Sequence, residues 1–127
     1  MSVDPYQYGD YNQPIDVLIE TERFNTKKMG EEFKGFSWLT ARYLHISYYS
    51  VSEDFTIQFI WKNSKDSSVF QSISYTVDKN ENNFKQRLPS SLVCYEWQIR
   101  VIGTFTTEFE LHGFLLDADP YLIGGRG

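Results

Sequence analysis

Residues that could act as acids, bases or nucleophiles are few in this sequence of 127 residues. Its two histidines, His45 and His112, both fall in stretches with the pattern of β-strands. No serine, cysteine or carboxylate stands at a spacing from either that suggests a catalytic triad. We therefore predict that the chain is not an enzyme. If it were one, these two histidines would be the first residues to mutate.

Carboxylates near the two ends of the chain could offer oxygen ligands to calcium. They are Asp4 and Asp10 near the start, and Asp117 and Asp119 near the end. A calcium loop needs alternating carboxylates around a glycine, and neither pair has that pattern. We interpret all four as solvated turn residues. The sequence predicts no bound metal and no other cofactor.

A single cysteine, Cys94, limits the chemistry further. It cannot form an intramolecular disulfide, and with two distant histidines it cannot supply the four ligands of a structural zinc site. No neighbouring cation pattern indicates a reactive thiolate, so we expect a small buried side chain at the start of a strand. Gly124, Gly125 and Gly127 precede no helix, so they cannot form a phosphate-binding loop. A flexible tail is expected there.

Aromatic side chains are unusually abundant, with 10 Phe, 9 Tyr and 3 Trp making up 17% of the chain. Packing in a core explains most of them. It does not explain Tyr6, Tyr8 and Tyr11, because residues 1–14 are broken by Pro, Gly and Asn and have no apolar period. Their rigid, amphipathic rings suit insertion into a pocket on a neighbouring molecule. We predict that these three tyrosines bind a partner as part of an N-terminal arm.

Strands must position the remaining side chains, because aromatic and β-branched residues fit a pleated sheet better than a helix. Residues 55–61 show the clearest alternation of apolar and polar side chains, and residues 95–101 repeat it. Strands are expected over residues 15–22, 36–49, 54–62, 69–77, 84–88, 94–102 and 108–117. The predicted core consists of Phe55, Ile57, Phe59, Trp61, Trp97, Ile99, Val101 and Leu111.

Strict alternation also predicts which side chains share a face of a strand. In the second stretch, Arg42 is expected on the same face as Leu44, Ile46 and Tyr48. In the last stretch, Leu115 is expected on the same side as Phe109 and Leu111. Val69 is likewise expected to continue the strand that contains Ile73, Tyr75 and Val77. Gly103-Thr104 is expected to form a turn.

Short strands at regular spacing, joined by polar turns and without a long amphipathic helix, indicate an all-β domain. An antiparallel sandwich and a closed barrel both fit, and we favour a jelly-roll-like β-sandwich of six to eight strands. We expect an extended N-terminal arm over residues 1–14, the sandwich over residues 15–119 and a flexible tail over residues 120–127. A chain of this length can form one hydrophobic core.

Charge and hydropathy argue against two classes of partner, nucleic acids and membranes. The formal net charge is −5, from 17 acidic and 12 basic residues, so the average field repels phosphate. No apolar run approaches the roughly 18 residues that span a bilayer. The N-terminus lacks the basic and apolar regions of a signal peptide. We predict no binding to nucleic acid or to a membrane.

Several short motifs in this order resemble a known family. They are Glu20-Thr21, Phe33-Lys34-Gly35-Phe36, Arg87-Leu88-Pro89, Trp97-Gln98-Ile99-Arg100 with Gly103, and Phe109-Glu110-Leu111-His112-Gly113. The chain resembles β-domains of tailed-bacteriophage tail proteins, particularly the C-terminal parts of the nozzle (tubular tail) proteins of short-tailed phages. The similarity spans roughly residues 15 to 119.

The resemblance implies a non-enzymatic structural component of the virion, assembled in the host cytoplasm. Its partners would be other virion proteins and copies of itself, arranged as a ring-forming homo-oligomer through subunit contacts and arm exchange. Proteins of this family are usually far larger than this chain. Whether the chain would belong to the tail, the neck, an adaptor or a decoration therefore stays open.

A carbohydrate-binding β-sandwich module is the alternative function. Exposed aromatic rings can stack on sugar rings, and four side chains are candidates for such a platform. They are Trp38, Tyr48, Tyr49 and Trp61.

Overall fold

The computed structural model describes residues 6–8, 14–50, 53–79, 82–90 and 92–121. Nine β-strands account for most of these residues, and two short 3₁₀ helices lie between the second and third strands. The strands are β1 (Tyr6–Tyr8), β2 (Ile15–Glu20), β3 (Trp38–Ser50), β4 (Phe55–Lys62), β5 (Gln71–Val77), β6 (Asn83–Arg87), β7 (Val93–Cys94), β8 (Glu96–Phe105) and β9 (Phe109–Tyr121). The helices are η1 (Thr26–Lys28) and η2 (Glu31–Phe33).

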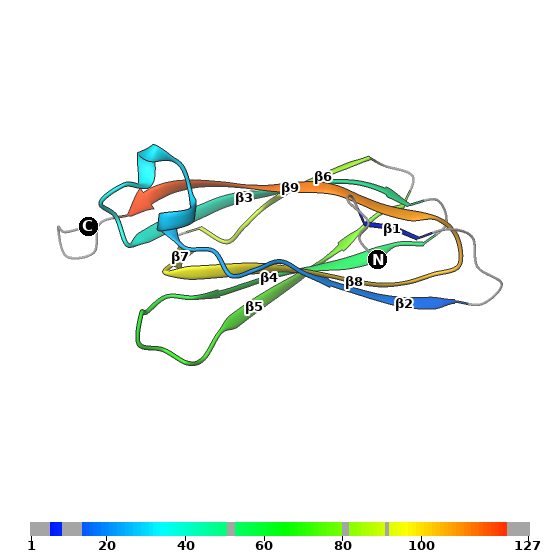
Figure 1. The fold of residues 1–127 in the computed structure, drawn as a ribbon, viewed down its shortest axis with the longest axis horizontal. Helices are drawn as coiled ribbons and strands as arrows, with labels where there is room; N and C mark the ends of the chain where they lie inside the picture. Colours follow the sequence, from blue (N-terminus) through cyan, green and yellow to red (C-terminus); the bar gives the residue numbers. More distant parts are fainter. Residues whose placement is uncertain (1–5, 9–13, 51–52, 80–81, 91, 122–127) are drawn as a thin grey trace.

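The strands form two antiparallel sheets packed face to face (Figure 1). One sheet has the order β1-β9-β3-β6, with β7 also paired to β3, and the other has the order β2-β8-β4-β5. The first strand thus lies beside the last and the second lies beside β8, while the chain passes back and forth between the sheets. This wrapped order is that of a jelly roll. The predicted all-β, antiparallel sandwich is therefore confirmed.

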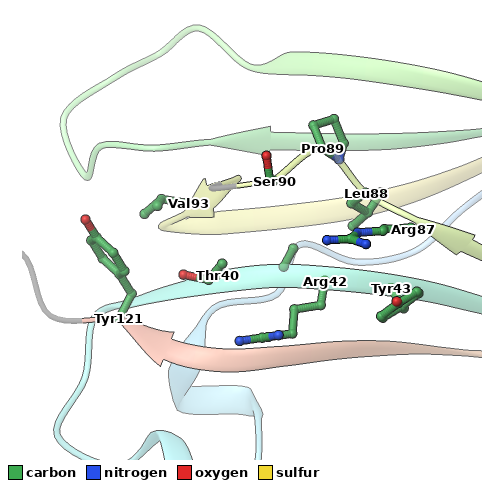
Figure 2. Close-up of a pocket in the computed structure, with 10 residues that line it drawn as sticks. Thr40, Arg42, Tyr43, Arg87, Leu88, Pro89, Ser90, Val93 and Tyr121 are labelled. Atoms are coloured by element: carbon green, nitrogen blue, oxygen red, sulfur yellow. The ribbon is translucent and has the colours of Figure 1, made fainter.

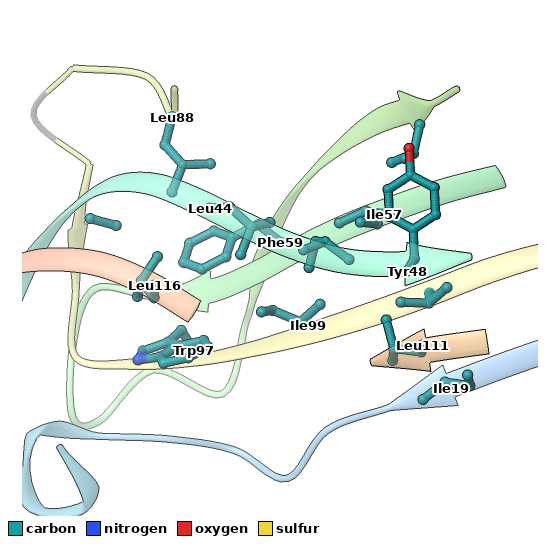
Figure 3. Close-up of a cluster of buried hydrophobic side chains, with 14 of the residues drawn as sticks. Ile19, Leu44, Tyr48, Ile57, Phe59, Leu88, Trp97, Ile99, Leu111 and Leu116 are labelled. Atoms are coloured by element: carbon teal, nitrogen blue, oxygen red, sulfur yellow. The ribbon is translucent and has the colours of Figure 1, made fainter. Parts of the chain in front are cut away.

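Aromatic rings fill much of the space between the sheets. Phe105 stacks on Phe109 with ring centroids 4.3 Å apart, and Phe55 meets the rings of Phe109 and Tyr48 edge-on at 5.1 and 5.0 Å. All four side chains are buried. Burial of one such ring contributes roughly 1.5–3 kcal/mol, so this cluster is a main source of stability. Seven of the eight predicted core residues are buried, among them Ile57, Phe59, Trp97, Ile99 and Leu111 (Figure 3). Trp61 is partly buried against the same core.

The expected turn at Gly103-Thr104 is wrong, because β8 runs without interruption to Phe105. Gly103 pairs with Val17 inside the sheet. A Cβ at this position would lie 2.7 Å from the ring of Phe105 and 3.0 Å from Cβ of Phe55. Glycine is therefore used here for close packing of its aromatic neighbours and not for a turn.

Two irregularities in the pairing of β3 with β9 overturn the predicted faces of these strands. The register shifts between Ala41 and Tyr43, where Arg42 is the extra residue, and again where β9 carries His112 as an extra residue. A β-bulge reverses the alternation beyond it. Ala41 consequently lies in the core with Leu44, whereas Arg42 is exposed. On β9, Leu116 takes the buried place that Leu115 was predicted to share, and Leu115 is 63% exposed.

Segments beyond the predicted domain limits also belong to the sheets. In the expected arm, Tyr6 to Tyr8 pair with Phe109 to Leu111 of β9, so β1 supplies one edge strand of the jelly roll. In the expected tail, Pro120 and Tyr121 pair with Leu39 and Trp38 of β3. The strand predicted from Val69 begins only at Gln71, and Val69 is 71% exposed. Alternation alone did not reveal these limits, because the pairing partners decide where a strand ends.

The connection between β2 and β3 is ordered by local hydrogen bonds. Asn25 caps η1 by accepting a bond from the Lys27 amide at 3.0 Å, and the Thr26 hydroxyl donates to the Phe36 carbonyl at 2.6 Å. Phe33 of η2 is buried in the core. Within the described ranges, no helix has the length and apolar character needed to cross a membrane.

Candidate functional site: a groove between β3 and β6

The chain segment that links β6 to β7 is tied down onto β3. The Leu88 amide donates to the Arg42 carbonyl at 2.8 Å, and the Ala41 amide donates to the Leu92 carbonyl at 2.9 Å. Leu88 and Leu92 are buried, so the segment is anchored by packing as well as by hydrogen bonds. The two ends of this segment therefore lie against β3.

A groove of about 440 Å³ is lined by residues of β3, of the end of β6 and of the segment that follows it (Figure 2). We call it the β3–β6 groove. Its volume falls within the usual range for small-molecule sites. Its lining combines the polar or aromatic residues Thr40, Arg42, Tyr43, Arg87, Ser90 and Tyr121 with the apolar residues Ala41, Leu88, Pro89 and Val93.

The β-bulge at Arg42 decides which side chains face the groove. In a regular strand Arg42 and Tyr43 would point to opposite faces of the sheet. Here both lie outside the core, between buried Ala41 and buried Leu44. Bulges are often found beside functional sites because they redirect side chains in this way. Tyr43 also stands opposite Arg87 in the β3–β6 pairing, which brings the second guanidinium alongside.

Cationic side chains are concentrated around Tyr43. Lys85 places its ammonium 4.7 Å from the centre of the Tyr43 ring, and Arg42 forms an ion pair with Asp119. Arg87 is exposed and forms no hydrogen bond or ion pair through its side chain within the described part of the chain. Asp119 offsets the charge of Arg42, and Asp117 stands opposite Tyr43 on β9. Arg87 is therefore the cation of the groove lining that has no ion pair among the described residues.

The groove's residue types suit the binding of an anion with polar surroundings. A guanidinium can hold a carboxylate or a sulfate through two parallel hydrogen bonds, and it is always charged. Thr40, Ser90 and the two tyrosines add hydroxyl donors and acceptors. None of the ten described lining residues is Asp, Glu, His or Cys, the usual groups for general acid–base or thiolate catalysis. The lining therefore offers guanidinium and hydroxyl groups that can hold an anion.

Comparison with known proteins gives little further direction. No protein-family model matches the chain, and no curated protein matches it. The crystal structure of PirA is similar, with 16% sequence identity, over 88% of this chain and 96% of the PirA chain, at a TM-score of 0.45. A likeness at this distance carries no argument about function.

The two histidines, His45 and His112, do not line the β3–β6 groove. His112 hydrogen-bonds Glu110 through Nε2 at 2.8 Å on the exposed part of β9. His45 lies on the outer face of β3, with its ring centroid 6.5 Å from that of Tyr43. Asp119 is engaged by Arg42, and no group of three or more metal-ligating side chains occurs within the described residues. Asp4 and Asp10 lie outside those residues.

Cys94 is fully buried in the core, where β7 pairs with Leu39 of β3. Burial raises the pKa of the Cys94 thiol well above its ordinary value, because the thiolate would lose its hydration. The thiol is therefore protonated and packed, as a structural residue would be.

The four aromatic residues proposed as a sugar-stacking platform do not form one. Tyr48 is completely buried, and its hydroxyl donates to the Asp78 carbonyl at 2.6 Å. Trp38 donates its indole N–H to the Asn63 carbonyl at 3.0 Å and stands eleven residues from exposed Tyr49 along β3. Trp61 stacks on Phe59 of the core. The prediction that Tyr48 stacks on a sugar ring is therefore wrong, because its ring is completely buried.

Two of the three predicted partner-binding tyrosines, Tyr6 and Tyr8, lie on β1, and Tyr11 lies outside the described residues. The backbone of β1 pairs within its own chain. Binding of a partner by these tyrosines stays a prediction.

Sequence reasoning did not identify the β3–β6 groove. Arg42, Arg87 and Tyr121 are separated by 45 and 34 positions, so no local motif links them. The bulge that exposes Arg42 has no glycine or proline to announce it. Arg42 in an otherwise apolar alternation was the one available signal, since a guanidinium seldom belongs on a buried face.

Proposed function

We propose that this chain is a non-enzymatic binding module whose β3–β6 groove recognises acidic saccharides. The observation that carries the proposal is Arg87, an exposed guanidinium without a partner among the described side chains, beside Tyr43 and within the groove. An arginine in such a setting can take a ligand carboxylate without first giving up an ion pair. Jelly rolls include lectin domains, although the fold alone does not establish a function.

The size and the hydroxyl groups of the groove favour a saccharide over a small inorganic anion as its ligand. Its volume of about 440 Å³ exceeds what a phosphate or sulfate needs. Hydroxyl groups of Thr40, Ser90 and Tyr121 are spread along it and can exchange hydrogen bonds with sugar hydroxyls. The ring of Tyr121, which is 39% exposed, offers an apolar surface at the groove's end.

Calorimetric titration with trigalacturonate and with its methyl ester tests this proposal. The two probes have nearly the same shape, and only the acid carries carboxylates. We expect the acid to bind and the ester to bind at least about tenfold more weakly, because a hydrogen bond to a charged group contributes about 1.5–3 kcal/mol. Equal binding of the two probes, or binding of neither, would count against the proposal.

Arg87→Gln and Lys79→Gln form a matched pair of variants for the same titration. Each removes one positive charge, but Lys79 lies on the turn after β5, away from the groove lining. We expect Arg87→Gln to weaken binding of the acid about tenfold and Lys79→Gln to leave it nearly unchanged. If both variants weaken binding equally, net charge and not the groove governs the affinity.

A structural role in a tailed-bacteriophage virion is the second candidate function. It is favoured by large apolar side chains that are exposed in the isolated chain, with Leu18 at 60% and Leu115 at 63%. Subunit contacts in the tail or neck could cover them. Arm exchange would replace the pairing of β1 with β9 of its own chain by the same pairing with β9 of a neighbour.

The mass of the native particle distinguishes the two candidates. Purification from the cells that make the chain, followed by mass photometry, should give a ring or larger assembly if the chain is a virion component. A species of one or two chains of 14.9 kDa would count against the virion role. It would leave the saccharide site to be judged by the titrations.

A further inference from the structure

The exposed edge of β5 has no charged side chain, unlike the edges formed by β2 and β6. The edge strand β1 of the other sheet has none either, but it is only three residues long. Among the described strands, β5 pairs only with β4, so its other edge presents free backbone N–H and C=O groups. Its sequence is Gln-Ser-Ile-Ser-Tyr-Thr-Val, and its register with β4 is unbroken over seven pairs. Proteins usually protect such an edge with charges, a proline, a bulge or a very short strand. β5 has none of these.

The edges formed by β2 and β6 are protected against self-pairing. β2 carries Asp16 and Glu20, and β6 carries Lys85 and Arg87. Two copies joined along either strand would bring like charges close together, which is destabilising across a sheet. Among the described edge strands longer than three residues, β5 is therefore the one that lacks a charged side chain.

From this edge we infer that the chain forms a two-fold dimer in which β5 pairs antiparallel with β5 of a second copy. With Ser74 on the two-fold axis, Ile73 of each copy faces Tyr75 of the other, and Ser72 faces Thr76. Ile73 and Tyr75 are half-buried on the inner face, whereas Ser72, Ser74 and Thr76 are exposed on the outer face. In this register apolar side chains face apolar side chains, and hydroxyl-bearing side chains face each other. The inner and outer faces of the sheet therefore continue from one copy into the other.

Charges at the ends of β5 complement each other in the same register. Phe70 of one copy comes opposite Asp78 of the other. The Arg23 guanidinium lies 4.5 Å from the centre of the Phe70 ring, and Asp78 is exposed. Arg23 of one copy therefore lies near Asp78 of the second copy. The two-fold axis repeats this contact at the other end of the paired strands. This charge complementarity favours a second copy over an unrelated strand.

The dimer is expected to be reversible. A joint of one short strand from each copy buries less than about 1,200 Å² in total, which is the range of weak and transient interfaces. Self-association should consequently depend on concentration. The β3–β6 groove lies on the other sheet, so dimerisation leaves it open.

Disulfide trapping tests the register directly. In a Cys94→Ala background, Ser74→Cys places the two new thiols across the axis, where residues directly opposite have Cα atoms about 4.5–5.5 Å apart. Under mild oxidation we expect rapid formation of a covalent dimer. Ser72→Cys is the matched control, because it faces Thr76 and should cross-link at least about tenfold more slowly. Equal rates for the two variants would overturn the proposed register.

Sedimentation velocity over a range of concentrations tests the contact without new thiols. Ser74→Lys should abolish self-association, because it sets two ammonium groups against each other, while Leu18→Lys on the β2 edge should leave it intact.

A charge swap tests the contact between Arg23 and Asp78. Asp78→Arg should weaken association, and adding Arg23→Asp to it should restore association. If Ser74→Lys associates like the wild-type chain, or if the wild-type chain is monomeric at all concentrations, the inference is wrong. Saccharide binding by Ser74→Lys should equal wild type, so this outcome is separate from that of the proposed function.

Discussion

Two neighbouring strands in sequence, β4 and β3, show opposite relations between pattern and structure. β4 keeps an unbroken register with both of its partners. Phe55, Ile57 and Phe59 are buried in alternation, which ends at Ile60, since that side chain is buried as well. β3 is paired with β9 through two irregularities, and its alternation reverses at Arg42. Both strands contribute to the core, but only the irregular strand β3 also lines the candidate site.

The difference has a simple physical basis. A strand with perfect alternation gives every second side chain to the core and the rest to solvent, so it can present only evenly spaced groups. A bulge places two consecutive residues outside the core and bends the strand. Arg42 and Tyr43 occupy such a position, beside Arg87. The three experiments below test this contrast between the two strands.

Phe59→Ala should have the largest effect, because it removes a fully buried ring from the regular strand. We expect a loss of about 3–5 kcal/mol in the free energy of unfolding, measured by urea denaturation. Thr56→Ala on the opposite face of β4 should cost less than about 1 kcal/mol. Similar losses at the two positions would mean that β4 does not alternate as described.

Leu116→Ala and Leu115→Ala test the bulge on β9, the partner of β3. The two residues are adjacent and chemically identical, but Leu116 is 7% exposed and Leu115 is 63% exposed. Leu116→Ala should cost about 2–4 kcal/mol, and Leu115→Ala should change stability by less than about 0.5 kcal/mol. If Leu115→Ala lowered the free energy of unfolding more than Leu116→Ala, β9 would have the unbulged alignment that alternation predicts.

The smallest expected effect is the contribution of Cys94 to the pH dependence of stability. It tests whether β7, which pairs with β3, is buried in solution as described. Because burial raises the pKa of its thiol, the folded chain keeps a proton that the unfolded chain releases above about pH 8.5. The free energy of unfolding should therefore fall as pH rises above that value, by at most about 1.4 kcal/mol per pH unit from this group. Comparison of wild type with Cys94→Ala between pH 7 and pH 10 isolates the contribution. Parallel pH profiles would show that the thiol is not buried in solution.

The comparison of β4 with β3 also explains how far the sequence could be used to predict the site. Trp97, Ile99 and Val101 on β8 were predicted from alternation, since large apolar residues at every second position can be satisfied only by a buried face. Arg42 and Leu115 were assigned to the wrong faces because a bulge depends on the partner strand. The groove was missed altogether for the same reason.

The amino-acid sequence by itself determined an all-β sandwich and most of its core, because period-two alternation of aromatic and branched side chains is a local property. It also determined a net charge of −5 and a scarcity of catalytic groups. Only the tertiary structure decided that β1 completes the jelly roll, where the bulges fall, and that Arg42, Arg87 and Tyr121 line one groove. These features depend on pairing between distant strands, and pairing is set by the packing of the whole sheet rather than by any one segment.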